Sequence, residues 1–435
     1  MRMSDSLQDW LARLQHRHPT AIELGLERVR AVAERMHLPK PAGCVITVGG
    51  TNGKGSTVAF IEAIARAAGL RVGAYTSPHL LRYNERVRID GVDAGDAGLV
   101  AAFEAVEAAR GDISLTYFET GTLAALWLFA REKLDLAILE VGLGGRLDAV
   151  NIIDPDVAVI TTVDLDHMDW LGEDREDIGV EKAGIARAWK PLVLGDDEPP
   201  SSVLRHAYAI GASALRMGCD FFVDRAVDVD DASVGWQWRE PGFILDLPMP
   251  ELAAPVQLRN AATAIAALRA SPLEIPGAAW ARGIACARLP GRLQRLDGGE
   301  IEYRLDVGHN PQAAQALAEW LRNQPKQGRV HAVYAALADK DVEGVTAALA
   351  SLVDHWHLAG LDVEGRAQDA EALAARVRLP GATLNADVAT ALRRVQAIAA
   401  PGDRVLVFGS FHTVEAALHA LHSAGCREVG SPAPV

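Results

Sequence analysis

The stretch CVITVGGTNGKGSTVAFIEAIARAAGLRVGAYTS (44–77) decides the fold. CVITV (44–48) has the continuous apolar character of a buried strand, and GGTNGKGST (49–57) has the composition of a loop. VAFIEAIARAAGL (58–70) predicts a helix, and RVGAYTS (71–77) predicts a second strand. A strand, a helix and a further strand in this order form a βαβ unit, which predicts a parallel sheet.

The same alternation extends to both sides of this unit. Upstream, residues 20–37 place Ile22, Leu26, Val29 and Val32 at helical spacing and predict an amphipathic helix. Downstream, helices are predicted over 96–109, 120–132, 175–188, 201–209, 257–270 and 276–287, and strands over 134–141, 156–163 and 192–195. Short alternating runs between residues 211 and 250 predict antiparallel strands attached to the main sheet.

A second alternation begins after RLPGRLQRLDGGE (288–300), which we interpret as a linker because it is rich in Gly and Pro. Strands are predicted over 301–306, 330–336, 355–361 and 403–409, and helices over 311–322, 341–353, 369–378, 387–399 and 413–424. We therefore predict an α/β protein with two domains. We expect residues 1–292 to form a domain with a mostly parallel sheet of the P-loop type, and residues 293–435 to form a smaller Rossmann-like α/β domain.

The composition is that of a globular protein: 435 residues, 49% of them hydrophobic, are enough for two or three domains. A net charge of −14 argues against nucleic acid as a partner, because a surface that binds nucleic acid is basic. Cys44, Cys219, Cys286 and Cys426 lie far apart, which favours the reducing cytoplasm over a disulfide framework. The first 15 residues lack the apolar core of a signal peptide, and no apolar run approaches a membrane span. We expect a soluble, cytoplasmic protein.

The strongest chemical motif is Gly50-Thr51-Asn52-Gly53-Lys54-Gly55-Ser56-Thr57, between a predicted strand and a predicted helix. Glycines allow backbone N–H groups to close on phosphate oxygens, and the start of the helix adds partial positive charge. The Lys54 side chain can neutralise the β- and γ-phosphates of a nucleotide. The spacing is not that of the standard P-loop, because a glycine follows the lysine. The flanking strand and helix favour a phosphate site over a plain surface turn.

Side chains suited to a metal ion follow the neighbouring predicted strands. Glu140 ends an apolar strand and precedes a Gly-rich loop, which favours a metal ligand over a satisfied core carboxylate. His167, in TTVDLDHMD (161–169), is a candidate second ligand or phosphate contact. The ordinary P-loop rule favours Ser56 as a magnesium ligand and leaves Ser77 as the second choice. Lys182 is either an exposed lysine or a site lysine.

Polar side chains also follow two predicted strands of the second domain. Asp306 and His309 lie in LDVGHNP (305–311), and Ser410 lies in GSFHT (409–413). Each can serve ordinary helix capping. Their occurrence at one edge of the predicted domain indicates a cleft there.

These motifs resemble the folylpolyglutamate synthases of the Mur-ligase superfamily, and most of all the bacterial bifunctional enzymes that also act as dihydrofolate synthases. The resemblance covers nearly the whole chain. It rests on LGLERV (24–29), GTNGKGST (50–57), TSPHL (76–80), LTYFETGTL (115–123), LEVGLGGRLDA (139–149), DHMDWLG (166–172), EKAGI (181–185), RNAATA (259–264), LPGR (289–292), DVGHNP (306–311), ADKD (338–341) and GSFHT (409–413). Asn84, Val150 and Gly308 depart mildly from the family pattern, which bears on substrate preference.

The resemblance implies a ligase in which ATP phosphorylates a carboxylate of the pteroate or folate, and the amine of L-glutamate then attacks the acyl phosphate. It implies that the phosphates are held by Thr51, Asn52, Gly53, Lys54, Gly55 and Ser56, and that Asn260, Arg292 and Asp306 contact ATP. It assigns Mg²⁺ to Ser77, Glu140 and His167, and so replaces Ser56 by Ser77. Lys182 matches a lysine that the family carries as a carbamate. Lys54, Glu140, His167 and Lys182 are thus the expected catalytic residues.

The resemblance also implies substrate sites. The pterin is expected to contact Glu23, Leu24, Gly25, Thr116, Tyr117, Phe118, Glu119, Leu147, Asp148 and Ala149. For L-glutamate we name His309 and Ser410, with Arg86 as a further candidate because a guanidinium suits an anionic substrate. The GGRLDA stretch (144–149) favours the branch that uses dihydropteroate.

Three alternatives remain open. One is a synthase that only elongates folates and does not act on dihydropteroate. Another is a P-loop switch, which would hydrolyse ATP without an amino acid. The last is a cell-wall amino-acid ligase of the same superfamily, for which no motif is seen. We expect small-molecule partners only, no nucleic acid or membrane, and a monomer.

Overall fold

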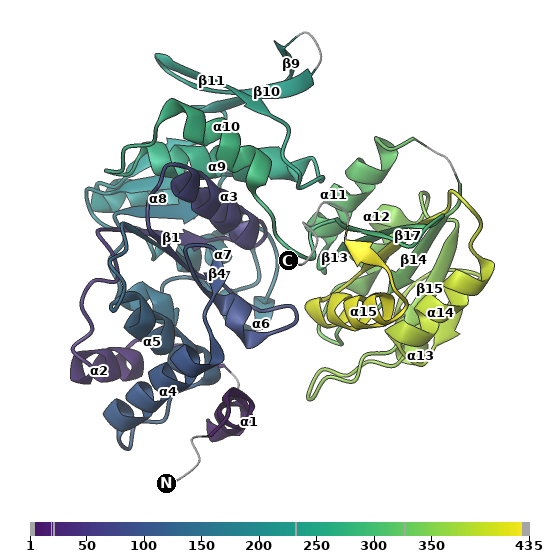
Figure 1. The fold of residues 1–435 in the computed structure, drawn as a ribbon, viewed down its shortest axis with the longest axis horizontal. Coiled ribbons are helices and arrows are strands. Elements are labelled where there is room, and N and C mark those ends of the chain that lie inside the picture. The colour runs from purple at the N-terminus through teal and green to yellow at the C-terminus, as the bar shows by residue number, and fades with distance from the viewer. Residues whose placement is uncertain (1–4, 19, 21, 231–232, 326–327, 429–435) are drawn as a thin grey trace. The chain divides into compact units, whose positions relative to one another are not determined.

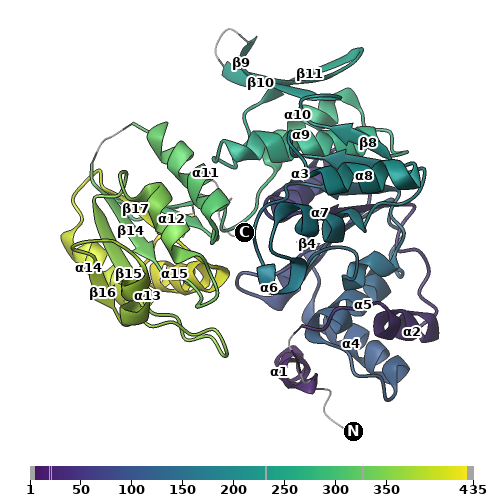
Figure 2. The same cartoon turned by 180° about the vertical axis from the view of Figure 1, so that it is seen from behind.

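The computed structural model describes residues 5–18, 20, 22–230, 233–325 and 328–428, with the backbone alone for 225–230, 233 and 234. The chain divides into two compact units. Unit 1 comprises Met1–Glu251 and Gln257–Arg288, and unit 2 comprises Leu252–Val256 and Leu289–Val435. Each unit contains a sheet that is mostly parallel and is packed with helices (Figures 1 and 2), which confirms the predicted fold class. No helix in the described part of the chain is long and apolar enough to cross a membrane.

The main sheet of unit 1 has eight strands in the order β4-β3-β2-β5-β1-β6-β7-β8. The strands are β1 (Cys44–Gly49), β2 (Val72–Tyr75), β3 (Val87–Ile89), β4 (Val92–Asp93), β5 (Leu136–Glu140), β6 (Val157–Ile160), β7 (Pro191–Leu194) and β8 (Ser213–Arg216). All neighbours from β2 to β8 pair in parallel, whereas β3 and β4 add an antiparallel edge. The carboxyl ends of β1, β2, β5 and β6 therefore meet at one edge of the sheet.

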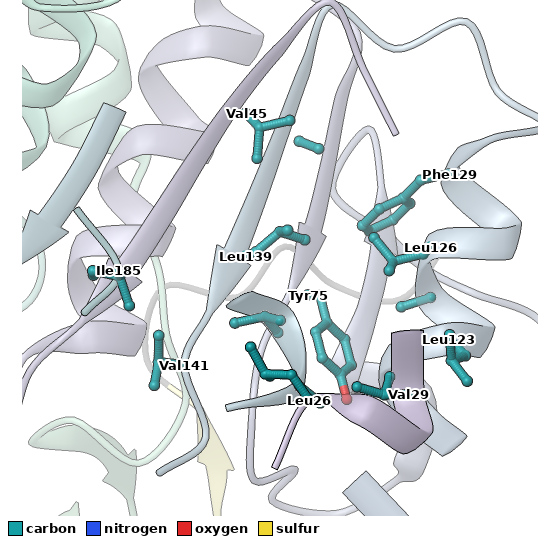
Figure 3. Packing of buried hydrophobic residues seen from close by; sticks show 14 of the residues in the cluster. Leu26, Val29, Val45, Tyr75, Leu123, Leu126, Phe129, Leu139, Val141 and Ile185 are labelled. Carbon is teal, nitrogen blue, oxygen red and sulfur yellow. The ribbon is translucent and has the colours of Figure 1, made fainter. Parts of the chain in front are cut away.

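Helices cover this sheet and bury its central strands on both faces, which explains their continuous apolar sequence. The helices of unit 1 are α1 (Leu7–Arg17), α2 (Glu27–Arg35), α3 (Lys54–Ala67), α4 (Asp96–Arg110), α5 (Tyr117–Phe129), α6 (Met168–Leu171), α7 (Arg175–Ala183), α8 (Ser201–Ile210), α9 (Val256–Arg269) and α10 (Gly277–Cys286), with 3₁₀ turns η1 (Tyr83–Arg86) and η2 (Ala149–Ile152). Val45, Tyr75 and Leu139 of the sheet pack in one core with Leu123 and Phe129 of α5 (Figure 3).

The helix predicted over 20–37 is shorter than expected. It begins at Glu27, and Ala21 lies outside the described residues. Gly25 has φ +151°, a backbone conformation that no helical residue adopts, so the helix cannot extend across it. Residues 22–26 therefore lie outside the helix.

The antiparallel strands predicted between 211 and 250 do not extend the main sheet. β9 (Phe222–Asp230), β10 (Ser233–Glu240) and β11 (Phe243–Pro248) form a separate sheet, which lies over α9 and α10 in Figure 1. Trp236 and Trp238 are two positions apart and lie on the same face of β10, where both are fully buried. Trp238 Nε1 donates to the carbonyl oxygen of Ala262 in α9, 3.1 Å away. Two indole rings on one face require a helical layer to cover them, which separates this sheet from the main one.

Unit 2 has a seven-stranded sheet in the order β16-β15-β14-β17-β13-β12-β18. Its strands are β12 (Gln294–Asp297), β13 (Glu302–Asp306), β14 (Val330–Tyr334), β15 (His355–Ala359), β16 (Thr383–Asn385), β17 (Arg404–Phe408) and β18 (Arg427–Glu428), and its helices are α11 (Pro311–Arg322), α12 (Val342–Leu349), α13 (Ala370–Arg376), α14 (Val388–Ile398) and α15 (Phe411–Ser423). The predicted linker 288–300 is only partly a loop, because it contains β12, which pairs antiparallel with β13. The neighbouring pairs β13–β17, β17–β14, β14–β15 and β15–β16 are all parallel.

Candidate active site

The loop between β1 and α3 requires glycine at two positions. Gly50 has φ +143°, and a Cβ there would lie 1.9 Å from Thr161 Oγ1. Gly53 has φ +87°, and a Cβ there would lie 2.5 Å from Asn260 Oδ1. Both glycines thus permit close approach of other groups to the loop backbone. The same geometry places Asn260, a predicted ATP contact, directly beside the phosphate loop.

The end of β6 fixes the shape of this loop through hydroxyl groups that sequence reasoning missed. Thr162 Oγ1 accepts a hydrogen bond from the Asn52 backbone N (3.1 Å), and Thr161 Oγ1 donates to the Asn52 carbonyl oxygen (2.6 Å). Thr51 Oγ1 donates to the Asp164 carbonyl oxygen at 3.0 Å. The signal in the sequence was the pair of threonines that follows an apolar strand at the start of TTVDLDHMD (161–169).

Lys54 is the first residue of α3, and its ammonium group turns back over the loop. Its Nζ donates to the carbonyl oxygens of Gly50 (2.9 Å) and Thr51 (3.1 Å). Gly55 and Ser56 follow in the first turn, with Ser56 only 1% exposed. A helix start with its free backbone N–H groups and a lysine at the same place attracts phosphate oxygens.

Two of the three predicted metal ligands lie side by side. Ser77 follows β2, Glu140 ends the neighbouring β5, and the Ser77 backbone N donates to Glu140 Oε2 at 3.3 Å. The Glu140 side chain is buried at 4% exposure. His167 follows β6 at the same sheet edge, with φ +52° and its Nε2 4.0 Å from Asp166 Oδ1. Among the described residues, no cluster of three or more His, Cys, Asp or Glu side chains forms a metal site by itself.

Lys182, near the end of α7, is a buried amine at the same edge, with 3% exposure. Burial and the charge of Lys54 together lower its pKa to about 7, while Asp166 and Asp148 act in the opposite direction. These four groups therefore lie close enough to influence one another's charge. Near neutral pH a large part of Lys182 is an uncharged amine, because a charged one is poorly solvated in this position.

Asp148 is a buried carboxyl group held by the Gly-rich loop after β5. It accepts hydrogen bonds from the backbone N–H groups of Gly142 (3.0 Å), Leu143 (2.8 Å) and Val150 (3.0 Å). Burial raises its pKa to about 6, although these bonds and the charge of Lys54 lower it. Asp148 thus shapes the loop and adds a titratable group to the site.

An arginine that the sequence analysis did not select joins two of the predicted pterin-binding stretches. Arg28 of α2 pairs with the Glu23 carboxylate, and its Nη2 donates to Glu119 Oε1 at 3.1 Å. Glu119 Oε2 also accepts from the Thr116 backbone N (2.8 Å), which closes a capping box at the start of α5. His18 Nε2 lies 2.7 Å from Glu23 Oε2. This network holds the loop before α2 against the start of α5.

The third predicted pterin stretch lies against the first two. A Cβ at Gly142 would lie 2.7 Å from the Phe118 ring, so α5 packs directly on the loop before η2. The turn η2, which starts at Ala149, also contacts α2. The structure therefore brings together all three stretches: Glu23, Leu24 and Gly25; Thr116, Tyr117, Phe118 and Glu119; and Leu147, Asp148 and Ala149.

Arg86 lies in the same region of unit 1. Its guanidinium carbon is 5.4 Å from the ring centres of both Tyr83 and Tyr117, and its Nε donates to His79 Nδ1 at 2.9 Å. The side chain is buried between these aromatic rings. Arg86 thus accompanies the predicted pterin stretch, whereas the other predicted glutamate-binding residues belong to unit 2.

In unit 2, the predicted ATP contacts Arg292 and Asp306 are neighbours. Asp306 ends β13 and accepts from the backbone N–H groups of Leu293 (2.9 Å) and Gly308 (2.7 Å). Burial raises the pKa of Asp306, and the charge of Arg292 lowers it. The Arg292 guanidinium lies 5.5 Å from the Phe411 ring centre.

The predicted glutamate residues follow the ends of adjacent strands β13 and β17 in this unit. His309 Nδ1 lies 3.0 Å from the Val307 carbonyl oxygen. Ser410 caps α15, because its Oγ accepts from the Thr413 backbone N at 3.0 Å and contacts Thr413 Oγ1 at 2.7 Å. The structure thus brings His309 and Ser410 to the edge that also holds Asp306.

Both units match the domains of one class of ligases. The Mur ligase middle domain matches residues 48–268, and the Mur ligase glutamate ligase domain matches residues 291–411. The first match contains the phosphate loop, and the second contains the Asp306 edge. The fold and the site thus define a Mur ligase.

Relatives place the chain within this class. It is 49% identical over 409 residues to the dihydrofolate synthase/folylpolyglutamate synthase of Escherichia coli (strain K12), with 94% of each chain covered, and 40% identical to the Haemophilus influenzae enzyme, with 95% and 97% covered. The chain belongs to the dihydrofolate synthase/folylpolyglutamate synthase family, as its motifs predicted.

Solved structures agree with this assignment. The E. coli FolC structure in complex with DHPP and ADP has a TM-score of 0.90 at 47% identity, with 97% of this chain and 98% of that chain covered. A bifunctional folylpolyglutamate synthase/dihydrofolate synthase with Mn, AMPPNP and L-glutamate bound has a TM-score of 0.88 at 48% identity, with 96% and 98% covered.

Proposed function

We propose that the protein joins L-glutamate to dihydropteroate to give dihydrofolate, adds further glutamates to reduced folates, and uses ATP to form an acyl phosphate in both reactions. The observation that carries this proposal is the meeting, at one sheet edge, of the phosphate loop, the buried Glu140 and the buried amine of Lys182. Relatives whose names state this activity support it, and their alignments cover 94% or more of this chain.

The phosphate loop binds and orients ATP. Its backbone N–H groups and the start of α3 face the phosphates, and Lys54 neutralises the charge that moves onto the leaving β-phosphate. Lys54 reaches the loop without a nucleotide, since it already bonds to the Gly50 and Thr51 carbonyl oxygens. Asn260 beside Gly53, and Arg292 and Asp306 in unit 2, are the further ATP contacts of this proposal.

Ser77, Glu140 and His167 are the residues that would hold Mg²⁺. The hydroxyl of Ser77 and the carboxylate of Glu140 are oxygen donors of the kind Mg²⁺ prefers, and a buried carboxylate is stabilised by a cation. When bound, the ion would offset the negative charge of the ATP phosphates. Glu140 itself orders the Ser77 backbone, so the strand ends present both donors together.

Lys182 is proposed to carry a carbamate. Its uncharged amine can attack CO₂, forming an N–C bond and releasing one proton, and the resulting anion would replace a cation next to Lys54. Nuclear magnetic resonance with ¹³C-bicarbonate tests this step. We expect a carbamate signal that is absent from Lys182→Met and present in Lys190→Met, a control at an exposed lysine. A signal unaffected by Lys182→Met, or no signal at all, would contradict the carbamate.

The substrates occupy two further regions in this proposal. The three stretches that meet around Phe118 bind the pterin, with Asp148 at their centre. His309 and Ser410 are proposed to bind L-glutamate, and Arg86 stays a further candidate for it, with its guanidinium beside the Tyr117 ring. The substrates are small molecules. That the protein is a monomer and lies in the cytoplasm stays a prediction.

Release of ADP tests the proposed function and its alternatives. Purified protein is given ATP, Mg²⁺ and L-glutamate, with dihydropteroate in one reaction and tetrahydrofolate in another. We expect glutamate-dependent release with both acceptors. Release with tetrahydrofolate alone would leave an elongating synthase, and release without glutamate or acceptor would instead support the ATPase switch.

A further inference from the structure

Arg88 of β3 forms a buried ion pair with Glu62 of α3. The guanidinium donates from Nε and Nη2 to Glu62 Oε2 at 3.0 and 2.9 Å. The two side chains are 16% and 8% exposed. Burial lowers the pKa of Arg88, but Glu62 outweighs this effect and the pKa lies above its ordinary value. Arg88 therefore stays charged.

The same guanidinium reaches the end of β2. Its Nη1 donates to Thr76 Oγ1 at 3.1 Å and to the Glu85 carbonyl oxygen at 3.0 Å. Thr76 immediately precedes Ser77, whose backbone N donates to Glu140 Oε2. A continuous set of contacts thus runs from α3, the helix that starts with Lys54, through Arg88 to the two oxygen donors at the sheet edge.

Arg88 also acts on Glu140 through charge. Its guanidinium is near enough to Glu140 for the two to attract each other. A buried carboxylate is costly when alone, and a fixed cation near it offsets part of that cost. Thr76 is fixed a second time by its backbone N, which donates to the Arg86 carbonyl oxygen at 2.9 Å.

We propose that Arg88 and Glu62 are a positioning pair for the divalent-ion site, because they fix Thr76 and hence the Ser77–Glu140 arrangement relative to α3. This inference rests on the proposed function, which assigns the ion to Ser77 and Glu140. Neither residue of the pair touches substrate. Mutation of residues that hold metal ligands in place typically lowers metal affinity by about 10- to 100-fold.

Arg88→Lys and Glu62→Gln test this role. Lysine keeps the positive charge but lacks the planar fork that reaches Glu62 and Thr76 together. Glutamine keeps the shape of Glu62 without its charge. A matched control is Arg71→Lys at the opposite end of β2, where Arg71 pairs with Glu132 at 2.6 Å and Asp90 at 3.4 Å.

The measurement is a titration of Mn²⁺ into full-length enzyme with AMPPNP, with bound ion followed by water-proton relaxation and folding checked by thermal unfolding. We expect the Mn²⁺ dissociation constant to rise about 10-fold in Arg88→Lys and Glu62→Gln. It should stay unchanged in Arg71→Lys, and the KM for dihydropteroate should stay unchanged in all three. If Arg88→Lys does not fold, Glu62→Gln decides.

Glu140→Gln distinguishes failure of the positioning role from failure of the ion assignment itself. Wild-type Mn²⁺ affinity in Arg88→Lys and Glu62→Gln, with affinity lost in Glu140→Gln, would overturn the positioning role and keep the ion assignment. Lower thermal stability with unchanged affinity would have the same meaning, since the pair would then be structural only. Wild-type affinity in Glu140→Gln would overturn the ion assignment and the positioning role together.

Discussion

The sheet edge of unit 1 and the sheet edge of unit 2 that carry the predicted site residues differ in how their polar groups are satisfied. In unit 1, Asp148 and Lys182 are buried and Lys54 is half-buried, and the charges of these three groups act on one another. In unit 2, the Asp306 carboxylate accepts from the backbone N–H groups of Leu293 and Gly308 and interacts with the cation Arg292, and Ser410 caps the helix that follows it. One edge thus brings two lysines close to each other, whereas the other pairs a carboxylate with a cation and caps its helix locally.

This difference indicates which of the two sheet edges performs the chemistry. Two lysines near each other, one of them buried, cost stability, and such arrangements persist where a reaction needs a shifted pKa. Local capping costs nothing and shapes loops that recognise a ligand. We therefore expect substitutions in unit 1 to abolish turnover and substitutions in unit 2 to weaken substrate binding.

The largest effect is expected for Lys54→Ala. Loss of the one lysine on the phosphate loop removes charge stabilisation of the transferred phosphoryl group, so kcat should fall about 1,000-fold or more. The fold should persist, because Lys54 is half-buried at the start of α3 and its Nζ donates to carbonyl oxygens of the loop. Steady-state ADP release and circular dichroism check this prediction. Turnover within tenfold of wild type would refute the role of Lys54.

Lys182→Met should change both activity and the pH dependence of stability. The unfolded chain binds a proton on Lys182 below its ordinary pKa of 10.5, whereas the folded chain does so only below about 7. Wild-type stability relative to Lys182→Met should therefore fall as the pH decreases from about 10 to about 7, and stay constant below that. Denaturant unfolding in CO₂-free buffer measures this difference. A difference that is independent of pH would contradict the lowered pKa.

Asp306→Asn should have a moderate effect on binding. The amide oxygen can replace one carboxylate oxygen toward Leu293 or Gly308, but not both. We expect the KM for ATP to rise about 10-fold with a smaller change in kcat. Asp297→Asn is the control, because Asp297 accepts a comparable loop bond from Gly299 (2.9 Å). Equal effects of both substitutions would remove Asp306 from the ATP site.

Ser410→Ala should have the smallest effect. Loss of the cap on α15 should lower the free energy of unfolding by about 1 kcal/mol. Asp387→Ala removes a similar cap, since Asp387 accepts from the Thr390 backbone N at 2.6 Å on α14. Denaturant titrations should show similar losses, and only Ser410→Ala should raise the KM for L-glutamate. An unchanged KM in Ser410→Ala would assign the hydroxyl to capping alone.

The sheets could be predicted from the sequence because their central strands are buried on both faces and therefore apolar throughout. The start of α2 could not, because helical spacing continues through Gly25 and only the backbone conformation shows the break. The placement of β9–β11 depends on what covers Trp236 and Trp238, which is a tertiary contact.

The candidate site shows the same limit. Glycine and lysine in the phosphate loop have a local signature, so Gly53 and Lys54 could be selected from the sequence. Arg88 and Glu62 lie 26 positions apart in the chain and meet only through the fold. Arg28 lies in the motif LGLERV (24–29), but its two carboxylate partners, Glu23 and Glu119, are remote from one another in sequence.

The formation of an acyl phosphate is the central claim, and transfer of ¹⁸O tests it most directly. Dihydropteroate labelled with ¹⁸O in its carboxylate is incubated with the enzyme, ATP, Mg²⁺ and L-glutamate, and the inorganic phosphate is analysed by mass spectrometry. If ATP phosphorylates this carboxylate, each phosphate should carry one ¹⁸O and the new amide should keep the other. Phosphate without ¹⁸O would mean that water attacks ATP, which would contradict the ligase mechanism.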